Sequence, residues 1–212
     1  MKTLIVTGGT GGLGTAVVER LSRDYQCVLL QRSDVGPASA LHKRIVDLSD
    51  QESVRSALSE VAAPYGLVHM AGGYAGGAVS ETSTEDWHGM IGLNLTSSFL
   101  VIRETLARMR RDAPGRIVAV SSAATLTKLA GAAAYTISKT GLNTLIELTA
   151  AELAGTPITA NALLPATLDT PAMRAAMPEA RRVPLDRVAE AIAFLLSDAA
   201  AGISGALIPL RA

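Results

Sequence analysis

A short apolar run near the start of the chain leads directly into a glycine-rich turn. Residues 2–6 have the character of a strand, and Thr7-Gly8-Gly9-Thr10-Gly11-Gly12-Leu13-Gly14 follows them. The segment 15–21 then alternates apolar and polar residues, as an amphipathic helix does. A glycine turn between a strand and a helix lets the backbone approach a pyrophosphate closely, and the helix N-terminus offers it free amides and a positive dipole end. This segment therefore predicts a nucleotide-binding turn.

The glycines of this turn fit two spacings. One is Gly9-x-Gly11-x-x-Gly14, and the other is Gly8-x-x-x-Gly12-x-Gly14. Only the second spacing places Thr7-Gly8 directly after the strand. A flexible loop that binds no ligand is the alternative to both. The candidates for contact with a bound nucleotide are Gly8, Thr10, Gly12, Leu13 and Gly14.

Further short apolar runs recur along the chain, with helical patterns between most of them. They lie at residues 27–30, 44–46, 66–70, 116–120, 158–163 and 206–210. This alternation predicts an α/β fold in which a doubly wound parallel sheet is covered by helices on both faces. With 212 residues, 49% of them apolar, the chain is long enough for one sizeable core and short for two. We expect a single domain over residues 1–212.

Local signals mark where two helices begin and where one is disturbed. Ser49-x-x-Glu52 has the form of a capping box and predicts a helix to residue 61. Ser83-x-x-Asp86 predicts a longer helix that runs to about residue 111. Gly89 and Gly92 lie within that helix near Asn94, where they either bend it or are tolerated at a modest cost.

Composition argues against several classes of protein. The formal net charge is +0, which provides no electrostatic footprint for nucleic acid or an anionic membrane. Two groups of arginines are interpreted as solvated helix ends: Arg108, Arg110 and Arg111, and Arg181 with Arg182. Cys27 is the only cysteine, and its place in a buried strand favours a small core side chain over a nucleophile. We see no leader, no apolar run of membrane-spanning length and no metal-binding pattern, so we expect a cytoplasmic protein.

A tyrosine and a lysine stand four residues apart in the segment 131–154, which is predicted to be largely helical. Positions i and i+4 share one helix face, so the phenol of Tyr135 and the ammonium of Lys139 project into the same space. A cation there is expected to lower the phenol pKa from about 10 and make it a useful proton relay. Ser122 precedes this pair and completes a set typical of proton transfer. A solvated helix face is the alternative interpretation.

With the glycine turn, Asn94, Ser122, Tyr135 and Lys139 in this order, the sequence resembles the short-chain dehydrogenase/reductase family over almost its whole length. The resemblance implies a Rossmann-type sheet of about seven parallel strands and an NAD(H) or NADP(H) cofactor. It also implies that Tyr135 donates a proton to a carbonyl or imine while hydride arrives from the nicotinamide, and that Ser122 holds the substrate oxygen. Lys139 would bind ribose hydroxyls and lower the tyrosine pKa, and Asn94 would fix a water behind the lysine.

The resemblance places further cofactor contacts along the sheet. Asp47-Leu48 matches an adenine contact after the third strand, although Asp47 could instead cap a helix beside Ser49. After the fourth strand, His69-Met70-Ala71-Gly72 stands where the family usually has Asn-Asn-Ala-Gly, so Ala71 and Gly72 are carried over and His69 is not. A histidine there is expected to be a hydrogen-bonded structural residue.

After the sixth strand, Pro165-Ala166 replaces the Pro-Gly turn that the family usually has. Leu168 and Thr170 still match positions that meet the carboxamide of the nicotinamide. The proline-punctuated stretch at about 170–184 follows, and it is the expected substrate-covering segment because binding residues tend to lie on loops beyond the strand ends.

Three stretches, at 68–77, 164–180 and 204–207, resemble dihydropteridine reductase. In that enzyme an aromatic residue at the position of Tyr74 lies by the pterin, so Tyr74, Ser122 and Tyr135 are the substrate-binding candidates. That enzyme lacks the catalytic serine, whereas this chain has Ser122. An ordinary carbonyl reductase with a related covering segment is therefore the alternative.

The end of the second strand bears on the choice of cofactor. NAD-preferring relatives carry Asp where this chain has Gln31. Without that carboxylate nothing repels a 2′-phosphate, and Arg32 with Ser33 could bind it. Asp34 is either a displaced ribose ligand or a turn cap. The sequence therefore favours NADP(H) over NAD(H).

Taken together, these features favour an NAD(P)H-dependent oxidoreductase that reduces a carbonyl or a quinonoid pterin-like imine. A non-catalytic dinucleotide-sensing protein on the same fold is the main alternative, and an isomerase or dehydratase is another. The expected partner is a small-molecule substrate, with no nucleic acid and no membrane. Relatives commonly pair the helices matched here by 83–111 and 135–154, which favours a homodimer or homotetramer.

Overall fold

The computed structural model describes residues 1–32 and 42–212, with side chains described for 1–32 and 46–212. Its strands are β1 (Lys2–Thr7), β2 (Tyr25–Gln31), β3 (His42–Ile45), β4 (Gly66–His69), β5 (Gly115–Val120), β6 (Ile158–Pro165) and β7 (Leu207–Leu210). They form a 7-stranded sheet of order β3-β2-β1-β4-β5-β6-β7, and every neighbouring pair is parallel. The predicted doubly wound parallel sheet is confirmed, and each apolar run supplies one of its strands.

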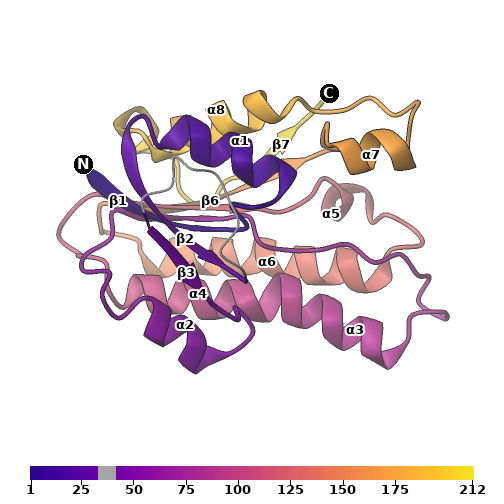
Figure 1. The fold of residues 1–212 in the computed structure, drawn as a ribbon, viewed down its shortest axis with the longest axis horizontal. Coiled ribbons are helices and arrows are strands. Elements are labelled where there is room, and N and C mark those ends of the chain that lie inside the picture. Colours follow the sequence, from indigo (N-terminus) through magenta and orange to yellow (C-terminus); the bar gives the residue numbers. More distant parts are fainter. Residues whose placement is uncertain (33–41) are drawn as a thin grey trace.

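Helices cover both faces of this sheet. They are α1 (Gly12–Leu21), α2 (Gln51–Ala57), α3 (Thr84–Ile91), α4 (Ser97–Leu106), α5 (Ala124–Thr127), α6 (Ala133–Glu152), α7 (Pro171–Ala176) and α8 (Leu185–Leu196), with a π-turn η1 (Gly92–Thr96) and a 3-10 turn η2 (Asp198–Ala200). Figure 1 shows α1 and α8 on one face of the sheet and α2, α4 and α6 on the other. Within the described residues, no helix has the length and apolar character needed to cross a membrane.

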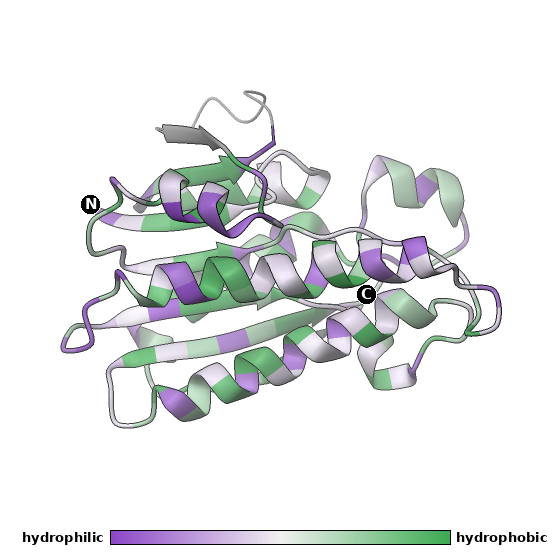
Figure 2. Cartoon of the chain, turned by 90° about the horizontal axis from the view of Figure 1, so that it is seen from below, coloured by the Kyte–Doolittle hydropathy of each residue, from purple (hydrophilic) through white to green (hydrophobic). Residues whose placement is uncertain are grey.

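The core is divided by the sheet into two layers. Along β1, Leu4 and Val6 pack with the α1 and α8 side, whereas Ile5 packs with the α4 and α6 side. In Figure 2 the strands are largely green, and green and purple residues alternate along the helices in front of them. Strands buried on both faces need near-continuous apolar residues, which is why the runs were visible in the sequence. Cys27 is 1% exposed in this core, as expected.

The order of the strands reverses between β1 and β4. From β1 the chain winds outward to β3, then returns to place β4 on the other side of β1. In open parallel sheets, such a reversal leaves a crevice at the carboxyl ends of the two central strands, where ligands bind. The glycine turn follows β1 and the segment Met70-Ala71-Gly72 follows β4, so the fold brings both to this crevice.

The predicted start of the second helix is wrong by one residue. Asp50, not Ser49, caps α2, and its side chain accepts a hydrogen bond from the amide of Ser53 at 2.7 Å. Ser49 instead donates its amide and its hydroxyl to Asp47, so Asp47 does not cap the helix either. The helix ends at Ala57, short of residue 61.

The long helix predicted from Ser83 begins where expected, because Ser83 caps α3 and accepts a hydrogen bond from the amide of Asp86 at 3.0 Å. It does not run unbroken to residue 111. The π-turn Gly92–Thr96 interrupts it at Asn94, and α4 ends at Leu106. The disturbance signalled by Gly89 and Gly92 is therefore a widened helical turn, a feature that often accompanies functional sites.

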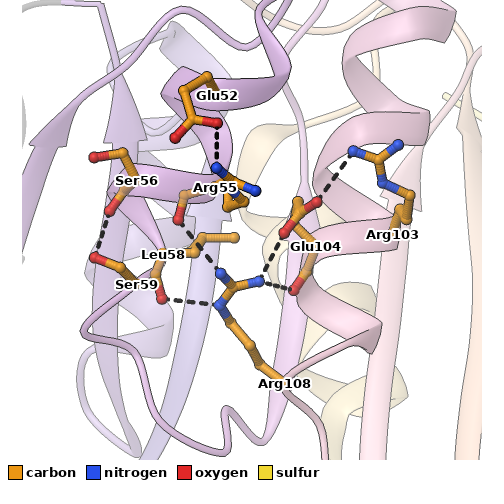
Figure 3. Close-up of polar contacts among 8 residues, drawn as sticks. All are labelled: Glu52, Arg55, Ser56, Leu58, Ser59, Arg103, Glu104 and Arg108. Carbon is orange, nitrogen blue, oxygen red and sulfur yellow. Dashed lines mark hydrogen bonds and ion pairs between the residues drawn. The ribbon is translucent and has the colours of Figure 1, made fainter.

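Arg108 was expected at a solvated helix end, and the structure contradicts this. Its guanidinium donates to the carbonyl oxygens of Leu58 at 3.0 Å and Arg55 at 3.3 Å, and it pairs with Glu104 at 2.8 Å. Figure 3 shows this side chain between the end of α2 and the end of α4. It supplies hydrogen bonds to carbonyl groups at the end of α2 that lack helical partners.

Candidate active site

The turn after β1 has the geometry of a phosphate-binding turn. Gly8 has φ +71°, and a Cβ added there would lie 2.7 Å from the amide nitrogen of Ala71. A Cβ on Gly14 would collide with the carbonyl oxygen of Gly8. The structure therefore needs glycine at both ends of the Gly8-x-x-x-Gly12-x-Gly14 spacing. Gly11 caps α1 without a side-chain hydrogen bond, and no acidic residue occupies the first helical turn, so the helix offers its amides to an anion.

A groove of about 1020 Å³ lies beside this turn. Many of the predicted cofactor contacts line it: Gly8, Thr10, Gln31, Arg32, Asp47, Leu48, Ala71 and Gly72. A groove with a glycine turn at its wall and an arginine at its rim fits a dinucleotide. Gly12, Leu13, Gly14, Lys139, Pro165, Leu168 and Thr170 are not among its lining residues. Leu13 is 8% exposed and packs into the core below the turn.

The end of the groove nearest β2 carries the residues that bear on cofactor choice. Gln31 is 5% exposed, and Arg32 is exposed. The hydroxyl of Ser49 donates to Asp47 and is the main cause of a lowered pKa for that carboxyl, with a smaller effect from the charge of Arg32. Ser33 and Asp34, the other residues predicted to bear on cofactor choice, lie outside the described residues.

Lys139 and Asn94 meet beside Gly72. A Cβ on Gly72 would lie 2.6 Å from Asn94 Oδ1 and 3.0 Å from Lys139 Nζ, so a larger residue would displace both groups. The ammonium donates to the carbonyl oxygen of Val120 at 3.0 Å. Burial lowers the pKa of Lys139 to about 8. The structure thus brings two of the predicted catalytic residues against the segment that lines the groove.

The pKa of Tyr135 is raised, which contradicts the expected lowering by Lys139. Burial of the phenol is the main cause, a hydrogen bond with Ser122 acts in the opposite direction, and Tyr74 raises the pKa further. The ammonium of Lys139 is directed to Val120 and does not contribute to this shift. A phenol with a raised pKa holds its proton at neutral pH, which is the state that a proton donor needs.

Ser122 is held by neighbours that leave its own proton available. Its Oγ accepts the amide of Ala124 at 3.2 Å, and its carbonyl oxygen accepts the hydroxyl of Thr125 at 2.8 Å. Asn143, from α6, donates to the Thr125 hydroxyl at 3.0 Å. The Ser122 hydroxyl can therefore donate toward a substrate oxygen. Sequence reasoning missed Thr125 and Asn143, although Asn143 follows Lys139 by four residues and so shares its helix face.

Tyr74 is 61% exposed and lies over the site. Its ring meets that of Tyr135 edge to face, with the centroids 5.0 Å apart. The structure thus brings the three predicted substrate-binding residues together, because Ser122 also lies near enough to Tyr135 to act on the pKa of its phenol.

The predicted covering segment is anchored beside the glycine turn. Thr170 caps α7 and lies 3.2 Å, through its Cγ2, from the position of a Cβ on Gly12. Leu168 pairs with Val183, which closes the segment at its base. Asp169 bonds Arg174 at 2.7 Å and Arg182 at 3.3 Å, so Arg182 is not a solvated helix end as expected.

This fold and this site define the class of the protein. A doubly wound parallel sheet carries a groove that fits a dinucleotide, and Gly72, which lines this groove, adjoins Lys139, one helical turn after Tyr135. The family model for short chain dehydrogenase matches residues 2–181. The chain belongs to the short-chain dehydrogenase/reductase family and is an NAD(P)-dependent oxidoreductase.

Relatives within the family have different named substrates. The chain is 30% identical to 3-oxoacyl-[acyl-carrier-protein] reductase MabA of Mycobacterium bovis, over 99% of the chain and 91% of that protein. It is 32% identical to 3beta-hydroxysteroid dehydrogenase of Mediterraneibacter gnavus, over 80% of the chain and 67% of that protein. The structure of Thermoplasma acidophilum aldohexose dehydrogenase matches with a TM-score of 0.90 at 27% identity, over 99% of this chain and 92% of that one.

Proposed function

We propose that this chain is an NADPH-dependent reductase of a small carbonyl compound, or of a quinonoid pterin-like imine, with Tyr135 as the proton donor. The observation that carries the proposal is the edge-to-face contact of Tyr135 with Tyr74, with centroids 5.0 Å apart, one helical turn before Lys139 and with Ser122 near enough to act on the phenol pKa. A substrate between Tyr74 and Ser122 would present its polar atom to two hydroxyl groups.

The protein groups have separate tasks in this reaction. The bound nicotinamide supplies the hydride. The Ser122 hydroxyl donates a hydrogen bond to the substrate oxygen or nitrogen and orients it toward Tyr135. Tyr135 transfers its phenolic proton to that atom, and Lys139 binds the ribose hydroxyls and stabilises the phenolate that results. The Asn94 side chain accepts a hydrogen bond from the Gly73 amide at 2.9 Å and donates one to the Gly73 carbonyl oxygen at 3.1 Å. We propose that it also fixes a water behind Lys139.

NADP(H) is the proposed cofactor because Gln31 and Arg32 line the groove. Gln31 stands where NAD-preferring relatives carry a carboxylate that would repel a 2′-phosphate, and Arg32 can bind that phosphate. Pro165, Leu168 and Thr170 are proposed to meet the nicotinamide carboxamide, since Thr170 lies against Gly12 of the phosphate-binding turn. Residues 170–184 are proposed to cover the substrate within the one domain.

The chain is further proposed to act in the cytoplasm as a homodimer or homotetramer. Helices α4 and α6 expose Phe99, Ile137 and Leu148, which are 46%, 45% and 56% exposed. Exposed apolar side chains on these helices are candidates for burial between subunits. Light scattering should give a mass of two or four chains, and Leu148→Glu should shift it toward the monomer.

The direct test replaces Tyr135 with Phe, which removes the ionisable hydroxyl and keeps the ring. NADPH oxidation is measured against a panel of ketones, quinones and quinonoid pterins. For the best substrate, kcat should fall by at least about 100-fold, since positioned acid catalysis is worth roughly 10²–10⁴-fold. The Kd of the Tyr135→Phe variant for NADPH should stay nearly unchanged. Lys139→Ala should lower kcat and also weaken NADPH binding.

Tyr25→Phe is the matched control, because the Tyr25 hydroxyl donates to the Leu196 carbonyl oxygen at 3.3 Å, away from the site. It should retain wild-type kcat. The role of Tyr135 is refuted by a Phe variant that keeps more than about a hundredth of wild-type kcat. Wild-type protein that binds NADPH and oxidises it with no member of the panel would contradict the proposed reaction.

A further inference from the structure

His69 joins three elements of the site through hydrogen bonds at both ring nitrogens. It is 0% exposed at the end of β4. Its Nδ1 lies 2.9 Å from Thr7 Oγ1, at the end of β1, and its Nε2 lies 2.8 Å from Ser98 Oγ, in the first turn of α4. One side chain therefore spans the distance between the glycine turn and the helix that follows the π-turn.

The neighbouring hydrogen bonds determine where the ring carries its proton. Ser98 donates its hydroxyl proton to the Asn94 carbonyl oxygen at 2.7 Å, so its Oγ must accept from His69 Nε2–H. The Thr7 Oγ1 accepts the amides of Met70 and Ala71 at 3.2 Å each, so its proton is available to His69 Nδ1. Both ends require the neutral ring protonated at Nε2.

Each half of this connection leads to a different part of the site. On the Nδ1 side, the Thr7 hydroxyl fixes the amides that directly precede Gly72, which lines the cofactor groove. On the Nε2 side, Ser98 holds the backbone of Asn94, and the Asn94 side chain returns to Gly73. These bonds close a loop around Gly72, where Lys139 and Asn94 meet.

We propose that His69 is a positioning residue, which holds Asn94 and the Ala71-Gly72 segment in the arrangement that frames Lys139. The inference rests on the proposed reductase activity only for its kinetic consequences. The two hydrogen bonds of His69 have separate effects. The bond to Thr7 positions the Ala71-Gly72 segment, and the bond to Ser98 positions Asn94. Loss of the Ser98 side should reduce turnover more than cofactor binding.

Two variants remove the Ser98 side. Ser98→Ala deletes the acceptor for Nε2–H. His69→Asn keeps a carbonyl oxygen for the Thr7 hydroxyl but is too short to reach Ser98. Each should lower kcat about 10-fold while the Kd for NADPH changes less than about 3-fold, and the double variant should be no worse than either single variant because both break one connection.

Thr149→Ala is the matched control. The Thr149 side chain is also a buried helix hydroxyl, 4% exposed, that bonds the carbonyl oxygen four residues earlier, at 2.7 Å, and this acceptor, Leu145, is not a site residue. This variant should keep kcat. Ser98→Thr retains a hydroxyl and should restore the turnover lost in Ser98→Ala, and it also serves if the alanine variant fails to fold.

Hydrogen exchange at the Gly73 amide provides a readout that needs no substrate, because this amide donates to Asn94 Oδ1 at 2.9 Å. Exchange should quicken about 10-fold in Ser98→Ala and in His69→Asn, and stay unchanged in Thr149→Ala. If the wild-type protein has no reductase activity but Gly73 exchange still quickens in Ser98→Ala and His69→Asn, the proposed function is overturned and the positioning role of His69 stands. Variants that lose thermal stability yet keep both kcat and Gly73 exchange would show a structural role alone and overturn the inference.

Discussion

Tyr74 meets Tyr135 edge to face, with ring centroids 5.0 Å apart and an interplanar angle of 69°. Most of Tyr74 is exposed, so its packing against Tyr135 leaves a large aromatic surface open beside the phenol that we propose as the proton donor. Gly76 lies beside this ring, because a Cβ added there would be 3.5 Å from the Tyr74 hydroxyl. The aromatic ring is therefore placed to contact a planar substrate.

Replacement of Tyr74 by Ala should raise KM for the substrate by about 10-fold, because a stacked aromatic contact is worth on the order of 1 kcal/mol or more. The Kd for NADPH should change little, since Tyr74 does not line the cofactor groove. Steady-state kinetics on every active substrate measure the first effect and fluorescence titration the second. Tyr74→Phe, which retains the ring, should keep KM near the wild-type value. An unchanged KM in the Ala variant would show that Tyr74 only covers the sheet edge.

Arg32 should determine the preference for NADPH over NADH. Its guanidinium lies at the rim of the groove beside the buried Gln31, where a carboxylate is absent. Arg32→Ala should weaken NADPH binding by about 10-fold or more and leave NADH binding nearly unchanged, as expected for loss of a charge-assisted contact. Calorimetry with both cofactors tests this. Arg55→Ala, a change to an exposed arginine paired with Glu52, is the control. Equal dissociation constants for the two cofactors in the wild type would contradict the assignment.

The sequence revealed the parts of this site that depend on short-range patterns. The glycine turn, the spacing of Tyr135 and Lys139, and the Ser83 cap each involve neighbours in the chain, so local geometry decides them. Pairings between distant residues left no such signal. His69 and Ser98 stand 29 residues apart, and Arg108 bonds Leu58 at a separation of 50. The raised pKa of Tyr135 likewise follows from burial, which i, i+4 spacing does not report.

Arg116 should contribute more to stability through its hydrogen bonds to backbone than through its ion pair. The side chain is 2% exposed and donates to the carbonyl oxygens of Gly115 at 2.8 Å, Pro157 at 3.2 Å and Ser197 at 3.3 Å. Its partner Asp198 is 80% exposed and 3.6 Å away. Arg116→Ala should lower the free energy of unfolding by roughly 2–4 kcal/mol, because it leaves a cavity and removes the side-chain hydrogen bonds to three carbonyl oxygens.

Asp198→Ala should cost less than about 1 kcal/mol, as for other exposed ion pairs. Urea denaturation of the two variants compares the effects. A loss in Asp198→Ala as large as that in Arg116→Ala would show that the ion pair dominates.

His69 should make the protein less stable as the pH falls below neutrality. Burial, with a smaller effect from the charge of Lys139, lowers its pKa from 6.5 to about 3. Between these values the unfolded chain binds a proton at this residue and the folded chain does not. The free energy of unfolding therefore rises with pH across this window, and the stability is lost as the pH falls through it, by about 1.4 kcal/mol per pH unit.

His69→Asn removes this titration, so comparison of the two proteins isolates the histidine. Urea denaturation at several pH values between about 7.5 and 5 should give a steeper decline for the wild type than for the variant, and the two slopes should differ by up to about 1.4 kcal/mol per pH unit below about pH 6. The lowered pKa values of Asp47, Glu104 and Asp169 favour acid unfolding at still lower pH, but these carboxylates are common to both proteins and cancel in the comparison. Equal slopes would mean that the folded protein protonates His69, and the network that joins Thr7 to Ser98 through a neutral ring would then be incorrect.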